Sequence, residues 1–258
     1  MKRFSPTLRA LPKALAIAAT AFALSACSNQ TTDSDEIQTE TIWANIKIAS
    51  DGERSRISTE LNVSGPGGNN LNLTSGDKLM VYADGITAEL EKDFDFFDID
   101  YQGYVSVTGS NELFTIALER PNDENAPNSK VHLPEAFDIE QPQANQLFVS
   151  NENINLKWDG RSGSQSIYTE LRSQCKTITG SDLLQVTDLT IEDDGQHTIV
   201  LEDLEMFQNN NLDKSKICTF EVYMQRKTFG NVDPLFKNNS KISATQYRKV
   251  ENVKIDLL

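Results

Sequence analysis

The sequence has few basic residues for its length, and this shortage limits the partners it can be expected to bind. Lys and Arg number 24 against 38 Asp and Glu, which gives a formal net charge of -14. Proteins that bind nucleic acids neutralise phosphates with Lys and Arg, so the composition argues against a nucleic-acid partner. It also disfavours direct docking on anionic lipid without divalent cations. We expect a solvated, acidic surface that repels polyanions.

Histidine and cysteine are scarce, and the sequence motifs of common enzyme classes are missing. The chain contains two His and three Cys. It has no Gly-x-Ser-x-Gly elbow, no His-Glu-x-x-His motif, no phosphate-binding loop and no dinucleotide fingerprint. We therefore assign no catalytic residue. A glycoside hydrolase needs only a pair of carboxylates, so that class stays open beside a non-catalytic module.

Long apolar runs are also missing, apart from one segment near the N-terminus. Four basic residues within the first thirteen precede an apolar stretch over residues 14–23. This stretch is shorter than the roughly twenty residues that span a bilayer, and its flanks are those of a signal peptide. It leads into the tetrad Leu24, Ser25, Ala26, Cys27.

The tetrad resembles the lipobox of bacterial lipoproteins. The resemblance implies that residues 1–26 are removed as a signal peptide and that Cys27 carries palmitate and other acyl chains. Ser28 replaces the Asp that retains such proteins at the inner membrane, which implies an outer-membrane lipoprotein facing the periplasm or the cell surface. The alternative is an ordinary secretory signal in which Cys27 is a bystander. Several acyl chains would anchor the protein stably, whereas one would hold it only marginally.

Two further expectations depend on this compartment. Residues 28–40 contain one apolar residue, Ile37, so we expect residues 27–40 to be the lipidated Cys and a flexible tether. Cys175 and Cys218 are the remaining cysteines, and an even pair in an oxidising compartment predicts a disulfide. A free thiol or a metal pair are the open alternatives.

The rest of the sequence has the period of β-strands. Ile42, Ala44, Ile46 and Ile48 alternate with polar residues, and similar runs return every eight to twelve residues or so without a helix-length amphipathic run. We predict an all-β fold of two tandem antiparallel β-sandwich domains. The expected domains cover residues 41–120 and 131–258, with a Pro-containing polar linker over 121–130.

One strand suggests the class of the second domain. The segment over residues 153–160 (NINLKWDG) places Trp158 on the apolar side of its strand. It resembles the core-Trp strand of immunoglobulin-like and fibronectin-type modules. The resemblance implies an immunoglobulin-like second domain, and it makes the whole chain similar to outer-membrane lipoproteins of Gram-negative bacteria with such domains.

The densest acidic run has two interpretations. Residues 93–101 (DFDFFDIDY) contain Asp93, Asp95, Asp98 and Asp100, which a bulge or tight bend between residues 96 and 97 would turn outward together. Clustered carboxylates suit calcium, the one cofactor that the sequence suggests. The alternative is a solvated acidic face, because the Asp-x-Asp-x-Asp-Gly spacing of an EF-hand is absent.

A loop over residues 230–234 (GNVDP) lies between two aromatic residues, Phe229 and Phe236. Exposed aromatic rings on a loop can stack on sugars or peptides, while the alternative is a loop held in place by its own apolar residues. We expect a lipid-anchored, non-catalytic envelope module that binds a protein or a glycan. The alternative is a carboxylate-dependent hydrolase of envelope polysaccharide.

Overall fold

The computed structural model describes residues 31–95, 98–160 and 165–257. These residues form an all-β fold, as the sequence predicts. The helical elements among them are four 3-10 turns, which are η1 (Ser34–Glu36), η2 (Thr39–Thr41), η3 (Leu201–Asp203) and η4 (Glu205–Phe207). Over the described ranges, none of the helices has the length and apolar character needed to cross a membrane.

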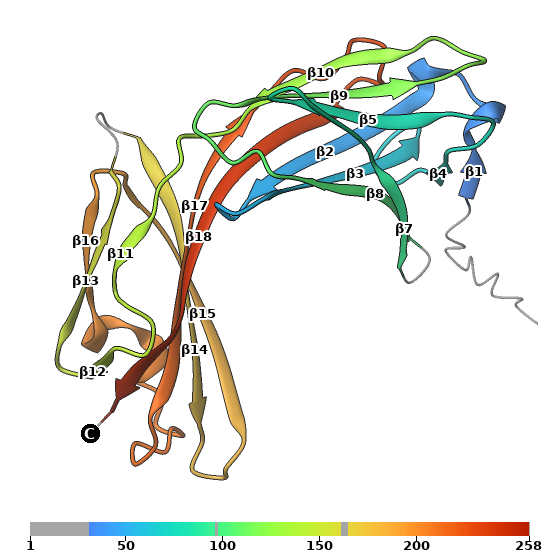
Figure 1. The fold of residues 1–258 in the computed structure, drawn as a ribbon. Helices are drawn as coiled ribbons and strands as arrows, with labels where there is room; N and C mark the ends of the chain where they lie inside the picture. The colour runs from blue at the N-terminus through green and yellow to red at the C-terminus, as the bar shows by residue number, and fades with distance from the viewer. Residues whose placement is uncertain (1–30, 96–97, 161–164, 258) are drawn as a thin grey trace, which may run out of the picture.

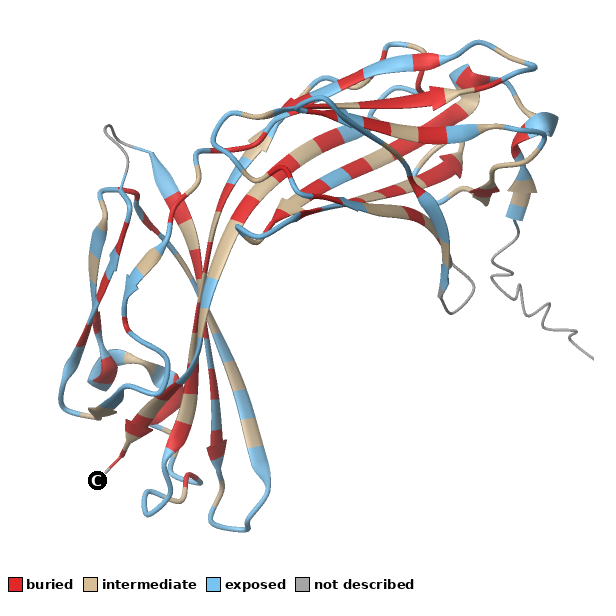
Figure 2. Cartoon of the chain, viewed as in Figure 1, coloured by how far each residue is buried: buried red, intermediate tan, exposed pale blue. Residues whose placement is uncertain are grey.

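The first sandwich encloses one apolar core between two sheets. One sheet contains β1 (Thr31–Asp33), β2 (Ile42–Ser50), β3 (Ser55–Val63), β4 (Asn70–Asn72), β7 (Glu91–Asp95) and β8 (Asp98–Val105), and the other contains β5 (Lys78–Ala83), β6 (Ile86–Glu89), β9 (Leu113–Glu119) and β10 (Ala126–His132). The predicted apolar face of β2 is confirmed, because Ile42, Ala44, Ile46 and Ile48 are all buried. Figure 2 shows the same alternation of buried and exposed residues along the other strands.

The second sandwich has the chain order of an immunoglobulin-like domain. One sheet contains β11 (Ile139–Gln141), β13 (Asn153–Trp158) and β16 (Gln196–Val200), and the other contains β12 (Leu147–Val149), β14 (Ser166–Lys176), β15 (Asp182–Glu192), β17 (Cys218–Phe229) and β18 (Lys241–Asp256). The chain passes from β13 to the β14–β15 hairpin in the facing sheet, returns to β16 beside β13, and ends in the β17–β18 hairpin. This exchange between two sheets is the Greek-key order of such sandwiches, and Trp158 lies in the core as predicted.

Two long strands belong to both sandwiches. β18 pairs antiparallel with β17 along its length, while its first part pairs parallel with β2 and its last part pairs parallel with β12. One 11-stranded sheet therefore continues from the first sandwich into the second. Figure 1 shows the molecule bent at this point, with the shared sheet on the inner side of the bend and the two smaller sheets outside. The two domains are joined by paired strands and not by a linker alone.

The predicted linker over residues 121–130 is wrong. β10 occupies 126–132 and pairs with β9, so most of this polar segment is a turn and a strand of the first sandwich. The chain crosses between the sandwiches at residues 134–136, after Leu133 of the first core and before Phe137 of the second. It later returns, because Phe236 and Ile242 pack in the first core. The prediction failed because it relied on polar composition, and an exposed hairpin is as polar as a linker.

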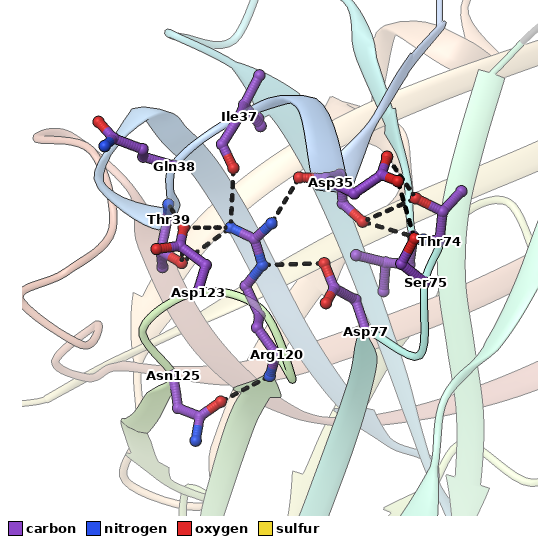
Figure 3. A network of polar contacts seen from close by, with 12 residues as sticks. Asp35, Ile37, Gln38, Thr39, Thr74, Ser75, Asp77, Arg120, Asp123 and Asn125 are labelled. Carbon is purple, nitrogen blue, oxygen red and sulfur yellow. Dashed lines mark hydrogen bonds and ion pairs between the residues drawn. The ribbon is translucent and has the colours of Figure 1, made fainter.

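The expected tether is also wrong where the structure describes it. β1 pairs parallel with β4, and residues 34–39 wrap against the first sandwich with Ser34 and Thr39 buried. The segment has little apolar surface to bury, so its docking depends on polar contacts. Three of these contacts meet at one buried side chain, Arg120 (Figure 3).

The guanidinium of Arg120 connects three segments of the first sandwich. Its Nε lies 2.9 Å from Oδ2 of Asp77, and its Nη1 lies 2.8 Å from Oδ2 of Asp123. The remaining donors reach the carbonyl oxygens of Ser34 and Ile37 and the hydroxyl of a neighbouring threonine. Arginine has five N–H donors in a fixed planar fork, and here that fork holds the N-terminal segment on the sandwich.

A second buried arginine holds the chain at the crossing point. Arg226 donates from Nε and Nη2 to the two carboxylate oxygens of Asp193, at 2.7 and 2.8 Å. Its Nη1 donates to the carbonyl oxygens of Glu135 and Ala136, both at 3.2 Å. The indole N–H of Trp158 donates to the same Asp193 carboxylate at 2.8 Å. One ion pair thus fixes the crossing segment, the β15–β16 turn and β13 together.

The predicted disulfide between Cys175 and Cys218 is confirmed. It joins the end of β14 to the start of β17, and both cysteines are buried in the second core. With a sequence separation of 43 between the two cysteines, the chain-entropy account gives about 4 kcal/mol of stabilisation. The bridge therefore ties together β14 and β17, the two central strands of the four-stranded part of this sheet in the second sandwich.

Arg120→Met should destabilise the protein by about 3–5 kcal/mol, because it leaves a buried Asp77 carboxylate without its cation. Lys78→Met is the matched control, since its ion pair with Glu89 is half exposed and should contribute about 0–1 kcal/mol. Chemical denaturation measures both changes. Limited proteolysis should also cut residues 31–40 faster in the Arg120 variant alone. Equal losses for the two variants would contradict the assigned role.

Candidate functional site

The strongest candidate site is the solvent face of the four-stranded part of the shared sheet in the second sandwich. Its strands lie in the order β15-β14-β17-β18, and every second residue of each points away from the core. Because the strands are paired in register, the outward side chains form rows across the sheet. We call this surface the tyrosine face. Its outward aromatic residues are Tyr168 on β14, Tyr223 on β17 and Tyr247 on β18.

Two neighbouring rows contain all three rings. In one row, Tyr168 lies opposite Gln225, and Gln225 lies opposite Tyr247. In the next row, Tyr223 lies between Glu170 and Lys249. The rings of Tyr223 and Tyr247 stack with their centroids 5.5 Å apart and an interplanar angle of 28°. The face thus presents flat apolar rings beside amide, carboxylate and ammonium groups.

A hollow of about 330 Å³ adjoins these rows, and its lining includes Arg172, Gln174, Leu184, Glu221 and Glu251. The Arg172 guanidinium donates to the Glu170 carboxylate and, at 3.4 Å, to the carboxylate of Glu221. The planar guanidinium is thereby held between two carboxylates on neighbouring strands. Such an arrangement offers fixed hydrogen-bonding groups to a polar ligand.

The hydroxyls of Tyr168 and Tyr223 remain neutral donors and acceptors in the ordinary pH range. Burial raises the pKa of Tyr223 to about 12, with smaller contributions from Tyr247 and Glu170. The hydrogen bond to Asp188 raises the pKa of Tyr168, as does the nearby Glu170. The Tyr168 hydroxyl donates to Asp188 at 2.6 Å, and the Tyr223 hydroxyl donates to Gln225 at 3.1 Å. The face is therefore preorganised by hydrogen bonds within and between its own strands.

The carboxylates of the hollow do not form a free acid–base pair. Glu221 pairs with Arg172, and Glu251 pairs with Lys249 at 2.6 Å. A glycosidase needs one carboxyl group that stays protonated beside a second that is ionised. Both of these carboxylates are instead bound to cations, so this site favours binding over hydrolysis.

The acidic run lies on a hairpin and not on a single strand. β7 pairs with β8, with Asp93 opposite Asp100 and Asp95 opposite Asp98, and the expected bend at residues 96–97 lies outside the described residues. The Asp93 carboxylate accepts a hydrogen bond from Gln102. Among the described side chains, no group of three or more His, Cys, Asp or Glu could hold a metal ion. The side chains of Asp95 and Asp98 are not among those described, so the calcium site stays a prediction.

The two aromatic residues of the predicted binding loop have different environments. Phe236 is buried in the first core and held by a turn at Asp233, so its assignment to a binding loop is wrong. The alternative, a loop held by its own apolar residues, describes it. Phe229 is 77% exposed at the end of β17, where Lys227 Nζ lies 5.2 Å from its ring centroid. Its role in binding stays a prediction.

Sequence reasoning missed the tyrosine face. Period-two alternation identified the strands, but an outward tyrosine in one strand gives no sign of which outward residues lie beside it. That information comes from the register of β14 against β17 and of β17 against β18. The available signal was the presence of Tyr168, Tyr223 and Tyr247 at the outward positions of long strands.

Comparisons with known proteins leave the family open. No family model matches the chain, and no curated relative matches it. Among solved structures it is similar to the fibronectin(III)-like modules of Clostridium thermocellum CbhA, with a TM-score of 0.22, 11% identity, and 83% of this chain and 93% of the other covered. It is also similar to a DUF4785 family protein from Legionella pneumophila, with a TM-score of 0.29, 8% identity, and 71% and 51% covered.

A third similar structure is the Bacteroides ovatus protein SGBP-B of a mixed-linkage glucan utilization locus, in complex with a heptasaccharide. Its TM-score is 0.22 and its identity 14%, over 87% of this chain and 46% of that one. The chain thus spans about half the length of the Legionella and Bacteroides proteins. With such low TM-scores, these likenesses carry no argument about a ligand or an activity.

Tyr223→Phe should remove one late step from the alkaline titration of the tyrosines. A folded pKa above the unfolded value of 10.0 stabilises the protein below pH 10 and loses that contribution as the pH rises to about 12. Ultraviolet absorbance of tyrosinate would count the steps. Tyr101→Phe is the positive control. Burial also raises the pKa of Tyr101 to about 12, so this variant should lose one late step as well. An unchanged number of late steps in Tyr223→Phe would show that this phenol is not buried as described.

Proposed function

We propose that this chain is a lipid-anchored, non-catalytic binding module of the bacterial cell envelope and that its tyrosine face binds a neutral glycan. The observation that carries the proposal is the pair of rows on the second sandwich, in which Tyr168, Tyr223 and Tyr247 alternate with polar side chains. Sugar rings have apolar C–H faces and polar rims. They therefore suit a surface of flat rings bordered by fixed hydrogen-bonding groups.

The charge of the tyrosine face favours a neutral glycan over an anionic one. Glu170, Glu221 and Glu251 lie on or beside it, and Arg172 and Lys249 are already paired with these carboxylates. A polyanionic glycan would meet carboxylates and no unengaged cation among these residues, and the net charge of -14 adds general repulsion. A neutral polymer avoids that cost, and its hydroxyl groups can donate to the carboxylates.

The lipid anchor would hold the first sandwich close to the membrane. If Cys27 is the lipidated residue, only residues 28–30 separate it from β1, which starts at Thr31. A chain extends by at most about 3.3–3.6 Å per residue, so the connection spans roughly 14 Å at most. The ordered N-terminal segment thus replaces the long tether with a short one, and the second sandwich lies at the other end of the molecule from β1 (Figure 1).

Tyr247→Ala should weaken binding of a neutral polysaccharide about tenfold, which corresponds to ~1.4 kcal/mol, because it removes one ring of the stacked pair. Affinity electrophoresis against neutral glucans, chitin oligomers and a polyuronic acid, followed by calorimetry on the best ligand, would measure it. Tyr104→Ala is the matched control, since Tyr104 is an exposed tyrosine of the first sandwich packed under Arg54. We expect the polyuronic acid not to bind.

Three results would contradict this function. The proposal fails if no neutral glycan in the panel binds, or if the Tyr104 and Tyr247 variants lose affinity equally. Release of new reducing ends from the bound glycan would instead support the hydrolase alternative.

Cys27→Ser should release the protein from the membrane fraction and abolish labelling with palmitate, because the thiol that receives the acyl chains is gone. Ser28→Asp is the matched control, and the lipoprotein resemblance implies that it keeps the label but moves the protein from the outer to the inner membrane. Cell fractionation with a palmitate label measures both. Unchanged labelling of Cys27→Ser would rule out lipidation at this position.

A further inference from the structure

One edge of the shared sheet is open. The strand order ends at β15, which pairs along all of Asp182–Glu192 with β14 and with no other strand that the structure describes. In an antiparallel pair, every second residue directs its N–H and C=O away from its partner. This edge therefore presents a regular row of backbone donors and acceptors over an eleven-residue strand.

The edge lacks the features that usually prevent strand addition. Its sequence, DLLQVTDLTIE, contains no Pro, no Gly and no Lys or Arg, and its register with β14 has no bulge. Natural edge strands are commonly protected by such residues, by bulges or by being short. Its Leu, Val, Thr and Ile residues favour an extended strand. β15 is thus a long edge without a bulge and without Pro, Gly, Lys or Arg.

Both sides of the strand have apolar surface to cover. On the solvent side, Leu184 is 71% exposed and Val186 is 58% exposed. On the core side, Leu183 and Leu189 are half-buried and pack against the second core. A strand laid along this edge would cover apolar side chains on both of its faces as well as pair the backbone.

The carboxylates on β15 indicate which kind of strand could bind along its edge. Asp182, Asp188 and Glu192 share the solvent side of β15 with the two exposed apolar residues. A complementary strand has Val, Ile or Thr opposite the apolar centre and Lys or Arg opposite the carboxylates. A second copy of this chain would bring a strand with the same three carboxylates on a body that is itself strongly acidic.

We propose that the free edge of β15 binds an extended, basic segment of a protein partner by β-strand addition. The backbone hydrogen bonds supply affinity, and the pattern of carboxylates around Leu184 and Val186 supplies specificity. This site borders the tyrosine face, since Leu184 also lines the hollow and Asp188 accepts a hydrogen bond from Tyr168. It does not rest on the glycan proposal, because it uses the backbone edge of the sheet and not its tyrosines.

The probe is a synthetic peptide of the same length as β15 that alternates Val and Thr and has Lys at the positions opposite Asp182, Asp188 and Glu192. Fluorescence anisotropy on the full chain measures binding, and amide hydrogen exchange locates it. We expect binding that slows exchange within residues 182–192. A peptide with Pro at its centre and one with Glu in place of each Lys should bind at least tenfold more weakly.

Val186→Lys should weaken binding of the Lys peptide at least tenfold, because it places a cation in the apolar centre of the edge. Ile178→Lys is the matched control, since Ile178 is also exposed, at 68%, but lies in the turn before β15, and this variant should bind as the parent does. Both positions are exposed, so both variants should keep the thermal unfolding temperature of the parent.

Three outcomes would overturn the proposal. Equal binding of the Lys and Pro peptides would show that backbone pairing is not involved. Binding without slowed exchange in residues 182–192 would place the peptide elsewhere. Concentration-dependent dimerisation that protects the same amides without peptide would make a second copy the occupant. If Tyr247→Ala loses glycan binding but keeps peptide binding, the two sites act independently and this inference is supported.

Discussion

The continuous pairing of β17 with β18 is the constraint on which the rest of the structure depends. The two strands stay paired from Cys218 opposite Ile255 to Phe229 opposite Ser243, with one register shift between Phe220 and Val222, and β18 contributes residues to both apolar cores. A hinge between the sandwiches would have to break this ladder of backbone hydrogen bonds. The bend is therefore a property of a sheet and not of a flexible connection, and the tyrosine face keeps a fixed position relative to the first sandwich.

Two buried arginines complete what the shared strands begin. Arg120 holds residues 34–39 on the first sandwich, and Arg226 holds the crossing segment at residues 135–136 against Asp193. Both guanidinium groups use carbonyl oxygens of irregular backbone as acceptors. Buried backbone groups outside strands need such partners, because leaving them unpaired costs about 1–3 kcal/mol each. The ion pairs therefore make it possible for the chain to enter and cross the fold without regular structure.

The sequence predicted the parts of this fold that follow from local periodicity. Alternation of apolar and polar residues predicted the strands, and the position of Trp158 predicted the immunoglobulin-like second sandwich. The even cysteine pair predicted the Cys175–Cys218 bridge. It failed where contacts are long-range. Arg120 lies more than eighty positions from Ser34, and Lys241 begins a strand that pairs with Asn45. Polar composition led to a tether and a linker at segments that the structure holds by hydrogen bonds, because composition does not show which polar groups find partners.

The candidate site shows the same limit and also explains where the functional surfaces lie. Inward positions are constrained by packing, so they carry the periodic signal that sequence reasoning detects. Outward positions such as Tyr168 and Val186 are free of that constraint and can be used for recognition. In the second sandwich those positions lie on a sheet fixed by the disulfide on one side and by β17–β18 on the other. A rigid sheet presents rings and edge amides without an ordering cost at binding.

Figure 1 places β1 at one end of the molecule and the free strand β15 at the other. An anchor at Cys27 would therefore leave both recognition surfaces on the sandwich that is farther from the anchor.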